Sequence, residues 1–376
     1  MRTARSRVGT VALVVALLVG VAACSSDDGG DGKALAGGSS ASSDGSTTTT
    51  TSPDVSAAPA GKVATGEPTP SAGCGTSTAA PVEKKTVKLA VSSKDRSYDL
   101  MVPKAHDGET PLPVVVDFHG LAEGAVVHAQ MTQMGPLGDK EGFVAVFPQG
   151  LGSPVKWSLG DADDPDSDVP FVDAMLDDIE KALCVDTSRV YSTGLSFGAI
   201  MSSFIACGAL GDRFAAVAPV AGITHSDSCE PRHPMPVLTF HGTADPILLF
   251  NGGVNLSGLP TGAGGPGGAA ASTTTTTTQP ADLDGEGYPA AVAAWAEQNG
   301  CEAEPEDTKV SDDVIHRVYD CPPESPVEFY IVVGGGHSWP GSDFSKAIGS
   351  IVGPTTFDID ATELIWAFFQ RFRLPD

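Results

Sequence analysis

The chain has 376 residues, with 22 Lys and Arg against 47 Asp and Glu, and its formal net charge is −25. This excess of acid excludes a nucleic-acid-binding protein, because such proteins present a basic face that displaces counterions from phosphates. Hydrophobic residues make up 41% of the chain. A chain of this length with that apolar share can bury a large core.

The first 23 residues have the pattern of a secretory signal peptide. Three arginines precede an apolar run over residues 8–21, which is too short to span a bilayer comfortably. The run closes on Ala22-Ala23-Cys24, a small-residue pattern that resembles the lipobox of bacterial lipoproteins. We therefore expect Cys24 to become a lipidated N-terminus that anchors the protein to a membrane, outside the cytoplasm. Plain secretion with an incidental cysteine is the alternative.

Two stretches of the chain have low complexity. Residues 24–80 are mostly Ser, Thr, Gly, Asp, Ala and Pro, which cannot bury enough apolar surface to fold, so we predict a disordered tether. A stretch at about residues 252–284, rich in Gly and Thr, interrupts an otherwise globular region and is predicted to be a surface loop insertion. The folded part is then one domain over residues 81–376 that carries this loop, and we expect a monomer.

Short apolar runs alternate with helical patterns along this domain. Strands are predicted at residues 87–91, 98–102, 112–118, 143–147, 190–193, 214–220, 237–240, 309–319 and 327–333. Helices are predicted at residues 126–141, 169–183, 198–208, 288–299 and 359–372, the last with Asp360 and Glu363 as a capping-box-like start. Continuously apolar strands separated by helices predict an α/β fold, with a mostly parallel central sheet covered by helices on both faces.

Six cysteines remain once Cys24 is set aside. An even number in an exported chain indicates disulfides, and the six allow fifteen pairings. We predict a bond between Cys301 and Cys321, which flank a short strand-like segment. The pairing of the other four stays open: Cys74, Cys184, Cys207 and Cys229. Metal binding is the competing interpretation, but no Cys-x-x-Cys or His-x3-His spacing supports it, so no metal site is predicted.

A Gly-x-Ser-x-Gly motif follows a predicted strand and opens a predicted helix. It spans Gly194-Leu195-Ser196-Phe197-Gly198. In this context the two glycines permit a sharp turn that exposes the serine hydroxyl, and the helix start aims N–H groups at the same point. Ser196 is therefore the candidate nucleophile. In a chain of this composition the motif alone is weak evidence for a nucleophile. Its position between a predicted strand and a predicted helix makes that evidence stronger.

A serine hydroxyl needs a base, and on this type of strand–turn–helix site the acid and the histidine follow it in the chain. Asp245 comes directly after the strand at 237–240, and His337 directly after the strand at 327–333. Ligands bind at this carboxyl edge in open α/β sheets. We predict that His337 is the general base and that Asp245 orients it. His241 is interpreted as structural, and Asp227 and Asp320 are the competing acids.

The remaining predictions concern the oxyanion hole and the pocket. The N–H of Phe197 is one expected oxyanion donor, and the N–H of Leu121 is the second, with Gly120 as runner-up. Four residues are pocket candidates: His119, Gly120, Trp157 and Trp339. For His119 and for the two tryptophans, packing inside the fold is the alternative. The aspartate-rich residues 161–168 are interpreted as a solvated loop near the site rather than a calcium site, because they lack the EF-hand glycine.

Together these residues resemble the α/β-hydrolase esterases of the polyhydroxybutyrate depolymerase family, which is similar to feruloyl and acetyl-xylan esterases. The resemblance covers most of residues 82–376. Its clearest stretches are Asp117-Phe118-His119-Gly120, Phe147-Pro148-Gln149-Gly150, His241-Gly242-Thr243-Ala244-Asp245 and Gly336-His337-Ser338-Trp339-Pro340-Gly341. It implies a secreted serine esterase that needs no cofactor and uses Ser196, Asp245 and His337 as its triad.

Two other functions stay open at this point. One keeps the fold and changes the bond, as in a serine peptidase or an acyltransferase. The other is a non-catalytic, anchored binding protein that retains only the scaffold. The physiological ester is also open: hydroxybutyrate oligomers, feruloylated or acetylated sugars and small aryl esters all fit the resemblance.

Overall fold

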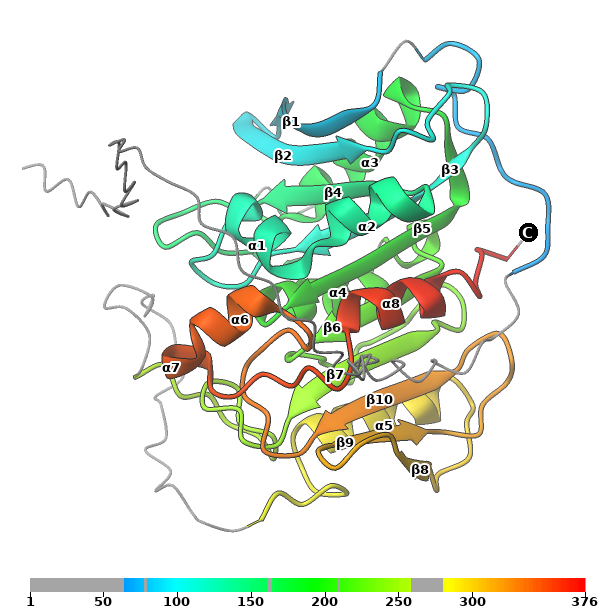
Figure 1. Cartoon of the computed structure of the whole chain (residues 1–376). Coiled ribbons are helices and arrows are strands. Elements are labelled where there is room, and N and C mark those ends of the chain that lie inside the picture. The colour runs from blue at the N-terminus through cyan, green and yellow to red at the C-terminus, as the bar shows by residue number, and fades with distance from the viewer. Residues whose placement is uncertain are drawn as a thin grey trace, which may run out of the picture. The chain divides into compact units, whose positions relative to one another are not determined.

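The computed structural model describes residues 64–77, 80–160, 164, 166–208, 210–257 and 280–375. Within these residues, ten strands form one sheet in the order β1-β2-β4-β3-β5-β6-β7-β10-β9-β8 (Figure 1). The strands are β1 (Val82–Val91), β2 (Lys94–Val102), β3 (Leu112–Phe118), β4 (Val144–Gln149), β5 (Val185–Leu195), β6 (Ala216–Val220), β7 (Val237–Gly242), β8 (Glu306–Lys309), β9 (Val314–Val318) and β10 (Val327–Val332).

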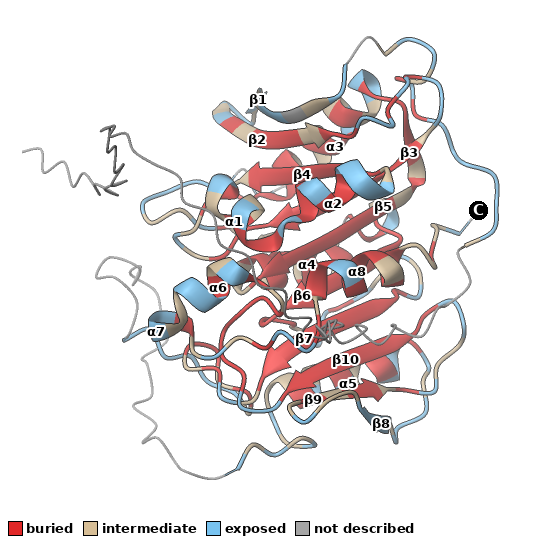
Figure 2. Ribbon diagram, in the orientation of Figure 1, coloured by how far each residue is buried: buried red, intermediate tan, exposed pale blue. Residues whose placement is uncertain are grey.

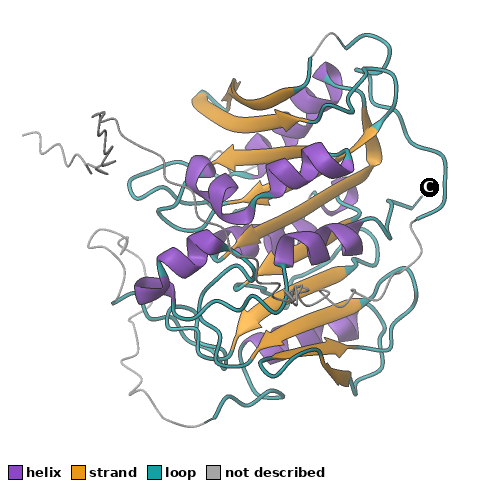
Figure 3. Cartoon of the chain, in the orientation of Figure 1, coloured by secondary structure: helices purple, strands orange, loops and turns teal. Residues whose placement is uncertain are grey.

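Helices cover both faces of this sheet (Figure 3). They are α1 (Ala125–Thr132), α2 (Met134–Glu141), α3 (Val169–Ala182), α4 (Phe197–Cys207), α5 (Tyr288–Gln298), α6 (Asp343–Ala347), α7 (Gly349–Val352) and α8 (Ala361–Phe369), with a 3-10 turn at Gly211–Arg213. The α1, α2 and α8 helices lie on the face toward the viewer of Figure 1, and α3, α4 and α5 lie behind the sheet.

The centre of the sheet is parallel and its two edges are antiparallel. Strands β4, β3, β5, β6, β7 and β10 run parallel, each to its neighbour. The β1–β2 pair closes one edge and the β9–β8 pair closes the other, each joined to the centre by an antiparallel contact. The predicted α/β class with a mostly parallel, doubly covered sheet is confirmed. Every parallel strand ends at the same edge, so loops that follow these strands meet there.

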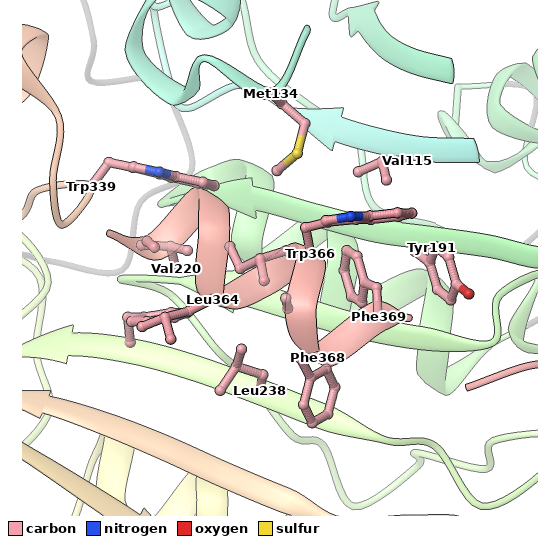
Figure 4. Close-up of a cluster of buried hydrophobic side chains, with 14 of the residues drawn as sticks. Val115, Met134, Tyr191, Val220, Leu238, Trp339, Leu364, Trp366, Phe368 and Phe369 are labelled. Carbon is pink, nitrogen blue, oxygen red and sulfur yellow. The ribbon is translucent and has the colours of Figure 1, made fainter. Parts of the chain in front are cut away.

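Side chains of the central strands alternate between two apolar layers. On β3, Val115 packs with α1, α2 and α8, whereas Val114 and Val116 pack with α3 and α4 on the other face. Figure 2 shows these strands buried along their length. Figure 4 shows how α8 lies on the same face of the sheet as Val115, with Trp366 and Phe369 beside Tyr191. Strands buried on both sides explain the unbroken apolar runs in the sequence.

One predicted helix is two helices in the structure. The pattern at residues 126–141 breaks at Gln133, whose φ of 54° is left-handed, and α2 begins at the next residue. Pro136 explains the break, because a proline ring inside a continuous helix would clash with the carbonyl of Thr132. That carbonyl instead accepts a hydrogen bond from Thr362 Oγ1 at 2.5 Å.

The strand predicted at residues 309–319 is a hairpin. The β8 strand ends at Lys309 and β9 begins at Val314, with a turn over residues 310–313. Polar residues Ser311, Asp312 and Asp313 form this turn, and Val310 N bonds to Val314 O at 2.9 Å. The short helices α6 and α7 were not predicted, because runs of four and five residues carry no helical periodicity.

The folded part begins earlier than the sequence predicts. Residues 64–77, assigned to the tether, are fastened to the start of β5 and the end of α8. Ser71 N bonds to Val185 O at 2.9 Å, Ser71 Oγ bonds to Leu183 O at 2.7 Å, and Ala64 N bonds to Gln370 O at 2.9 Å. Composition alone missed this because hydrogen bonds and a disulfide, rather than apolar side chains, hold the segment.

The structure contains three disulfides, and the predicted Cys301–Cys321 bond is confirmed. The four cysteines left open pair as Cys74–Cys184 and Cys207–Cys229. The first of these bonds ties residues 64–77 to the end of α3, across 110 residues of sequence. It is therefore a second reason to count this segment as part of the domain.

Several predictions lie outside the described residues: the signal peptide at 1–23, Cys24, the tether up to residue 63 and the middle of the insertion at 258–279. The two ends of the insertion are described, and Asn251 joins them. Its side chain donates to Asp282 O at 2.7 Å and accepts from Asp282 N at 2.9 Å. None of the helices in the described ranges is long and apolar enough to cross a bilayer.

Candidate active site

The turn that presents Ser196 is strained. Ser196 follows β5 and precedes α4, with φ 59° and ψ −117°, a backbone conformation that residues other than glycine rarely adopt. Ser196 N bonds to Val220 O at 2.9 Å, which holds the turn against the neighbouring strand. The serine is half-buried. A strained residue between a central strand and a helix is what a nucleophile elbow requires.

The elbow is possible because β3 passes very close to it. A Cβ on Gly198 would lie 1.8 Å from Phe118 O, and a Cβ on Gly194 would lie 2.5 Å from the same oxygen. Neither position can carry a side chain unless β3 moves. The two glycines of the motif are therefore fixed by packing, and they seat Ser196 beside the loop that follows β3.

Asp245 and His337 meet on loops that follow adjacent parallel strands, β7 and β10. Asp245 Oδ2 lies 2.7 Å from His337 Nδ1. Both side chains are buried, with exposed fractions of 3% and 5%. The two loops are tied to each other by Ala244 N, which bonds to Gly335 O at 2.9 Å. The competing acids Asp227 and Asp320 are exposed, and neither contacts the histidine.

The surroundings of Asp245 keep its carboxyl group ionised. Burial by itself raises the pKa, but the attraction of His337 and hydrogen bonds from His337 and His241 outweigh it and hold the pKa well below its usual range. Oδ1 also accepts from Ile247 N at 2.8 Å and Leu248 N at 2.9 Å. An ionised carboxylate only accepts, so Nδ1 of His337 carries the hydrogen in this pair. Nε2 is then the nitrogen that can take up a proton.

His241 shares the same carboxylate oxygen. Its Nε2 lies 3.2 Å from Asp245 Oδ2 and 2.9 Å from Leu248 O, and its ring stacks on Tyr288 with centroids 3.8 Å apart. This placement agrees with the structural role predicted from the sequence. His241 is also a second hydrogen-bond donor to the Asp245 carboxylate. The sequence spacing of the two residues did not indicate this contact.

Ser196, Asp245 and His337 all follow central strands at the carboxyl edge of the sheet. In sheet order β5 is two places from β7, and β10 is next to β7. The Asp245–His337 bond is formed, whereas the Ser196 hydroxyl makes no hydrogen bond to any part of the chain that the structure describes. A hydrogen bond from the Ser196 hydroxyl to His337 Nε2 is therefore part of the proposed mechanism.

The loop after β3 distinguishes the two candidates for the second oxyanion donor. Gly120 N donates to Glu123 Oε2 at 2.6 Å, so this N–H is already used. The N–H groups of Leu121 and Phe197 donate to no acceptor among the described residues, and Phe197 is the first residue of α4, where helix N–H groups have no partner within the helix. A Cβ on Gly120 would lie 3.5 Å from Ser196 Cβ, so this loop borders the serine.

Three of the four pocket candidates are buried side chains that pack inside the fold. His119 and Trp157 are 0% and 1% exposed, and their rings are tilted by 33° with centroids 4.5 Å apart. Trp157 Nε1 donates to His119 O at 2.7 Å. Trp339 is 1% exposed, and its Nε1 donates to Thr362 Oγ1 at 2.9 Å. These rings are buried and anchor the loops at the site, which agrees with the packing alternative.

The bonds of His119 fix its tautomer. Nδ1 lies 2.7 Å from Gly120 O, an acceptor only, and Nε2 accepts from Gly150 N at 3.0 Å. Burial lowers the pKa of His119 to about 4, so the ring is neutral at pH 7. His119 thus joins the loop after β3 to the loop after β4 and positions the oxyanion segment.

Asp168 does not belong to a solvated loop. Its carboxylate is buried and pairs with Arg96 Nη1 at 2.5 Å, while Ser158 N donates to it at 2.7 Å. Arg96 lies over the ring of Phe171. The exposed Asp166 fits the solvated interpretation, whereas Asp161 and Asp163 lie outside the described residues. Among the described residues, no group of three or more His, Cys, Asp or Glu side chains could hold a metal ion.

The strand order, the strained serine turn and the acid–histidine pair at one sheet edge define an α/β-hydrolase fold. The predicted fold class is thus confirmed in detail.

Residues 96–268 match the family model described as "Esterase PHB depolymerase". Among curated relatives, "Feruloyl esterase B" of Piromyces equi is 25% identical over 250 residues, which cover 65% of this chain and 42% of that protein. "Probable feruloyl esterase C" of Aspergillus niger is 32% identical over 167 residues, which cover 43% of this chain and 59% of that protein. These matches confirm the predicted resemblance to esterases of the PHB depolymerase family.

The matches span less than two thirds of the length of either relative. A solved structure, "Acetyl xylan esterase from Aspergillus awamori", has a TM-score of 0.47 at 13% identity, and the match covers 68% of this chain and 94% of that one.

Proposed function

We propose that this protein is a serine esterase that cleaves carboxylic esters through an acyl-enzyme on Ser196. The observation that carries the proposal is the 2.7 Å contact between the ionised Asp245 and His337, at the sheet edge where the strained Ser196 turn also lies. The esterase family match and the named esterase relatives support the choice of an ester as the bond that is cleaved.

In the proposed reaction, Ser196 Oγ attacks the ester carbonyl carbon while its proton passes to His337 Nε2. Asp245 stabilises the imidazolium that forms. The N–H groups of Phe197 and Leu121 hold the negative oxygen of the tetrahedral intermediate. When the intermediate collapses, His337 returns the proton to the departing alcohol. Water then attacks the acyl-enzyme, again with His337 as base. The bond between the acyl group and Ser196 Oγ breaks, Ser196 takes the proton back from His337, and the carboxylic acid leaves.

Replacement of Ser196 by Ala tests this mechanism. We expect the variant to lose turnover of p-nitrophenyl acetate and stoichiometric labelling by a fluorophosphonate probe, because both need the serine oxygen. Ser228→Ala, on an exposed loop, is the control and should keep both activities. Unchanged turnover in Ser196→Ala would overturn the proposal. A folded wild-type protein that the probe does not label would favour a non-catalytic binding protein.

The substrate class within the proposal is an ester with a small acyl or aryl acyl group. The names of the relatives favour feruloyl and acetyl esters, and the family description favours hydroxybutyrate oligomers. A panel of these esters, compared with matched amides and with acyl transfer to added alcohols, ranks them. Faster cleavage of the amides would identify a peptidase, and net transfer to the alcohol would identify an acyltransferase.

We further propose that the protein works outside the cytoplasm, attached to a membrane through a lipidated Cys24. The support is the signal-like sequence at residues 1–23 and the three disulfides, which form in oxidising compartments. Metabolic labelling with a radioactive fatty acid tests the anchor. Label in the wild type but not in Cys24→Ser supports it, and release of unlabelled protein to the medium indicates plain secretion.

A further inference from the structure

A buried cluster that the sequence analysis missed lies behind the oxyanion loop. His128, on α1, has Nε2 2.7 Å from Asp117 Oδ1 and Nδ1 3.1 Å from Glu123 Oε1. Asp117 is next to last in β3, and Glu123 lies in the loop that follows. The side chains of His128 and Asp117 are fully buried and that of Glu123 is 10% exposed. The proposed triad uses none of the three.

The cluster reaches the oxyanion loop through the bonds that Glu123 makes to the main chain of Gly120. The second oxygen of Glu123, Oε2, accepts the Gly120 N–H at 2.6 Å. Glu123 N returns a bond to Gly120 O at 3.3 Å, and Ala122 between them has a left-handed φ of 63°. The carboxylate therefore closes a tight turn around Leu121, the residue whose N–H is the expected oxyanion donor.

The other end of the cluster is fixed by the rest of the fold. Thr132 Oγ1 donates to Asp117 Oδ2 at 2.7 Å, and Thr362 Oγ1 donates to Thr132 O. The His128 and Trp339 rings are also perpendicular to each other, with centroids 6.0 Å apart. Trp339 is two residues from His337, so the cluster abuts the loops of both the base and the oxyanion hole.

Charge complementarity holds the cluster together. Burial alone would lower the pKa of His128, but the carboxylates of Asp117 and Glu123 outweigh it and raise that pKa to about 10. A protonated ring donates from both nitrogens, one to each carboxylate. The imidazolium thus bridges the rigid end of β3 and the loop.

We propose that Glu123, held by His128 and Asp117, is a positioning residue that sets the Leu121 N–H in place for the oxyanion. This inference rests on the proposed esterase function. An oxyanion donor acts only when it points at the oxygen of the tetrahedral intermediate, so its loss costs turnover more than substrate binding. Glu123 does not touch the substrate; it acts through the turn that it closes.

The test compares Glu123→Ala with two conservative variants. In Glu123→Gln the amide oxygen can accept the Gly120 N–H, and the amide N–H can donate to a neutral His128. We expect kcat within about threefold of wild type. In Glu123→Ala we expect kcat to fall about 10- to 100-fold, less than the loss of a whole donor, with KM within about twofold. Glu123→Asp keeps the charge but is one carbon too short, so it should fall like Ala.

A boronic acid that mimics the tetrahedral intermediate supplies a readout beyond turnover. Its affinity should fall by about the same factor as kcat in Glu123→Ala and Glu123→Asp, and it should be kept in Glu123→Gln. All rates are expressed per serine titrated with a fluorophosphonate, so unfolded protein is not counted. If Glu123→Ala does not fold, Glu123→Asp gives the same comparison.

Glu328→Ala is the matched control. Glu328 is also a buried glutamate paired with a histidine, His316, at 2.9 Å. It sits near the start of β10, away from the carboxyl edge. We expect this variant to lose stability and keep kcat per titrated serine within about twofold. Unchanged kcat and boronate affinity in Glu123→Ala and Glu123→Asp, or equal losses in Glu328→Ala, would overturn the inference. A wild type that is not labelled at Ser196 would overturn the proposed function instead.

Discussion

Asp245 Oδ2 lies 2.7 Å from His337 Nδ1 and 3.2 Å from His241 Nε2, so one buried carboxylate oxygen serves two histidines. The other oxygen accepts two main-chain N–H groups. The Asp245 carboxylate thus has four contacts with donor groups, and the fold holds each of these groups in place. The arrangement fixes which nitrogen of His337 carries its hydrogen, and that choice decides whether the ring can serve as a base.

The first prediction is that Asp245→Asn retains the fold and loses turnover. The amide oxygen can still accept from Ile247 and Leu248, but the amide N–H₂ favours the His337 tautomer with hydrogen on Nε2, which cannot take a proton from Ser196. We expect kcat for p-nitrophenyl acetate to fall by about 10³- to 10⁴-fold at pH 7, with KM within a few-fold. Steady-state kinetics measure both.

Asp227→Asn, at an exposed acid, is the control for this prediction and should behave like wild type. If Asp245→Asn kept more than a tenth of wild-type kcat while its circular dichroism was unchanged, Asp245 would not be the residue that orients His337.

The elements that could be predicted from the sequence are those whose local pattern and burial agree. The run at residues 112–118 predicted β3 to the residue, because a strand buried on both faces reads as unbroken apolar sequence. Ser196, Asp245 and His337 were predicted as the candidate triad for a similar reason, since each lies in the turn or loop that follows such a strand. The break at Gln133 was missed although Pro136 marks it, because the apolar spacing continues across the break.

The residues that could not be predicted are those whose role depends on contacts far along the chain. His128 meets Asp117 across eleven residues and Trp339 across more than two hundred, and neither spacing has a local signature. The burial of Trp157 likewise depends on its contact with His119, which only the fold brings about. Periodicity reports which face of an element is apolar and does not report which polar groups meet in three dimensions.

The second prediction concerns Gly198. A Cβ at this position would lie 1.8 Å from Phe118 O and 2.8 Å from His119 O, both main-chain atoms. Gly198→Ala should therefore lower the free energy of unfolding by about 3 kcal/mol or more, since the strand that carries the oxyanion loop must move. Urea unfolding measures the change.

Gly349→Ala is the comparison for this prediction, because nothing lies within 4 Å of the added Cβ. It should be neutral or stabilising by up to about 1 kcal/mol, as alanine favours a helix over glycine. Equal stabilities for the two variants would show that β3 does not constrain the elbow.

The third prediction is that the Cys74–Cys184 bond stabilises the domain more than either short-range disulfide. It closes 110 residues, whereas Cys207–Cys229 closes 22. In the chain-entropy model these loops are worth about 5 and about 3 kcal/mol. Paired Cys→Ser variants, compared by urea unfolding, should follow this order.

Truncation gives an independent check of the same bond. A chain that begins at residue 64 should be as stable as the full chain, whereas one that begins at residue 81 lacks Cys74 and should match the Cys74→Ser/Cys184→Ser variant or fall below it. Equal stability of the two truncated chains would mean that residues 64–77 contribute nothing to the fold.

The last prediction uses two buried histidines whose pKa values move in opposite directions. His128 is held at a pKa of about 10 by Asp117 and Glu123 against the cost of burial, and burial lowers the pKa of His119 to about 4. Against an ordinary value of 6.5, folding keeps a proton on His128 that the unfolded chain releases above about pH 6.5. The contribution of His128 to stability is therefore complete below pH 6.5 and is lost as the pH rises toward 10. The contribution of His119 is complete above pH 6.5 and is lost as the pH falls toward 4, because only the unfolded chain takes up that proton. Each slope is at most about 1.4 kcal/mol per pH unit.

Urea unfolding of wild type, His128→Gln and His119→Asn measures these slopes at pH 5, 6.5 and 9. The advantage of wild type over His128→Gln should shrink from pH 6.5 to 9, and its advantage over His119→Asn should shrink from pH 6.5 to 5. An advantage over His128→Gln that stays constant from pH 6.5 to 9 would mean that the buried ring is neutral and that the bridge between β3 and the oxyanion loop carries no charge.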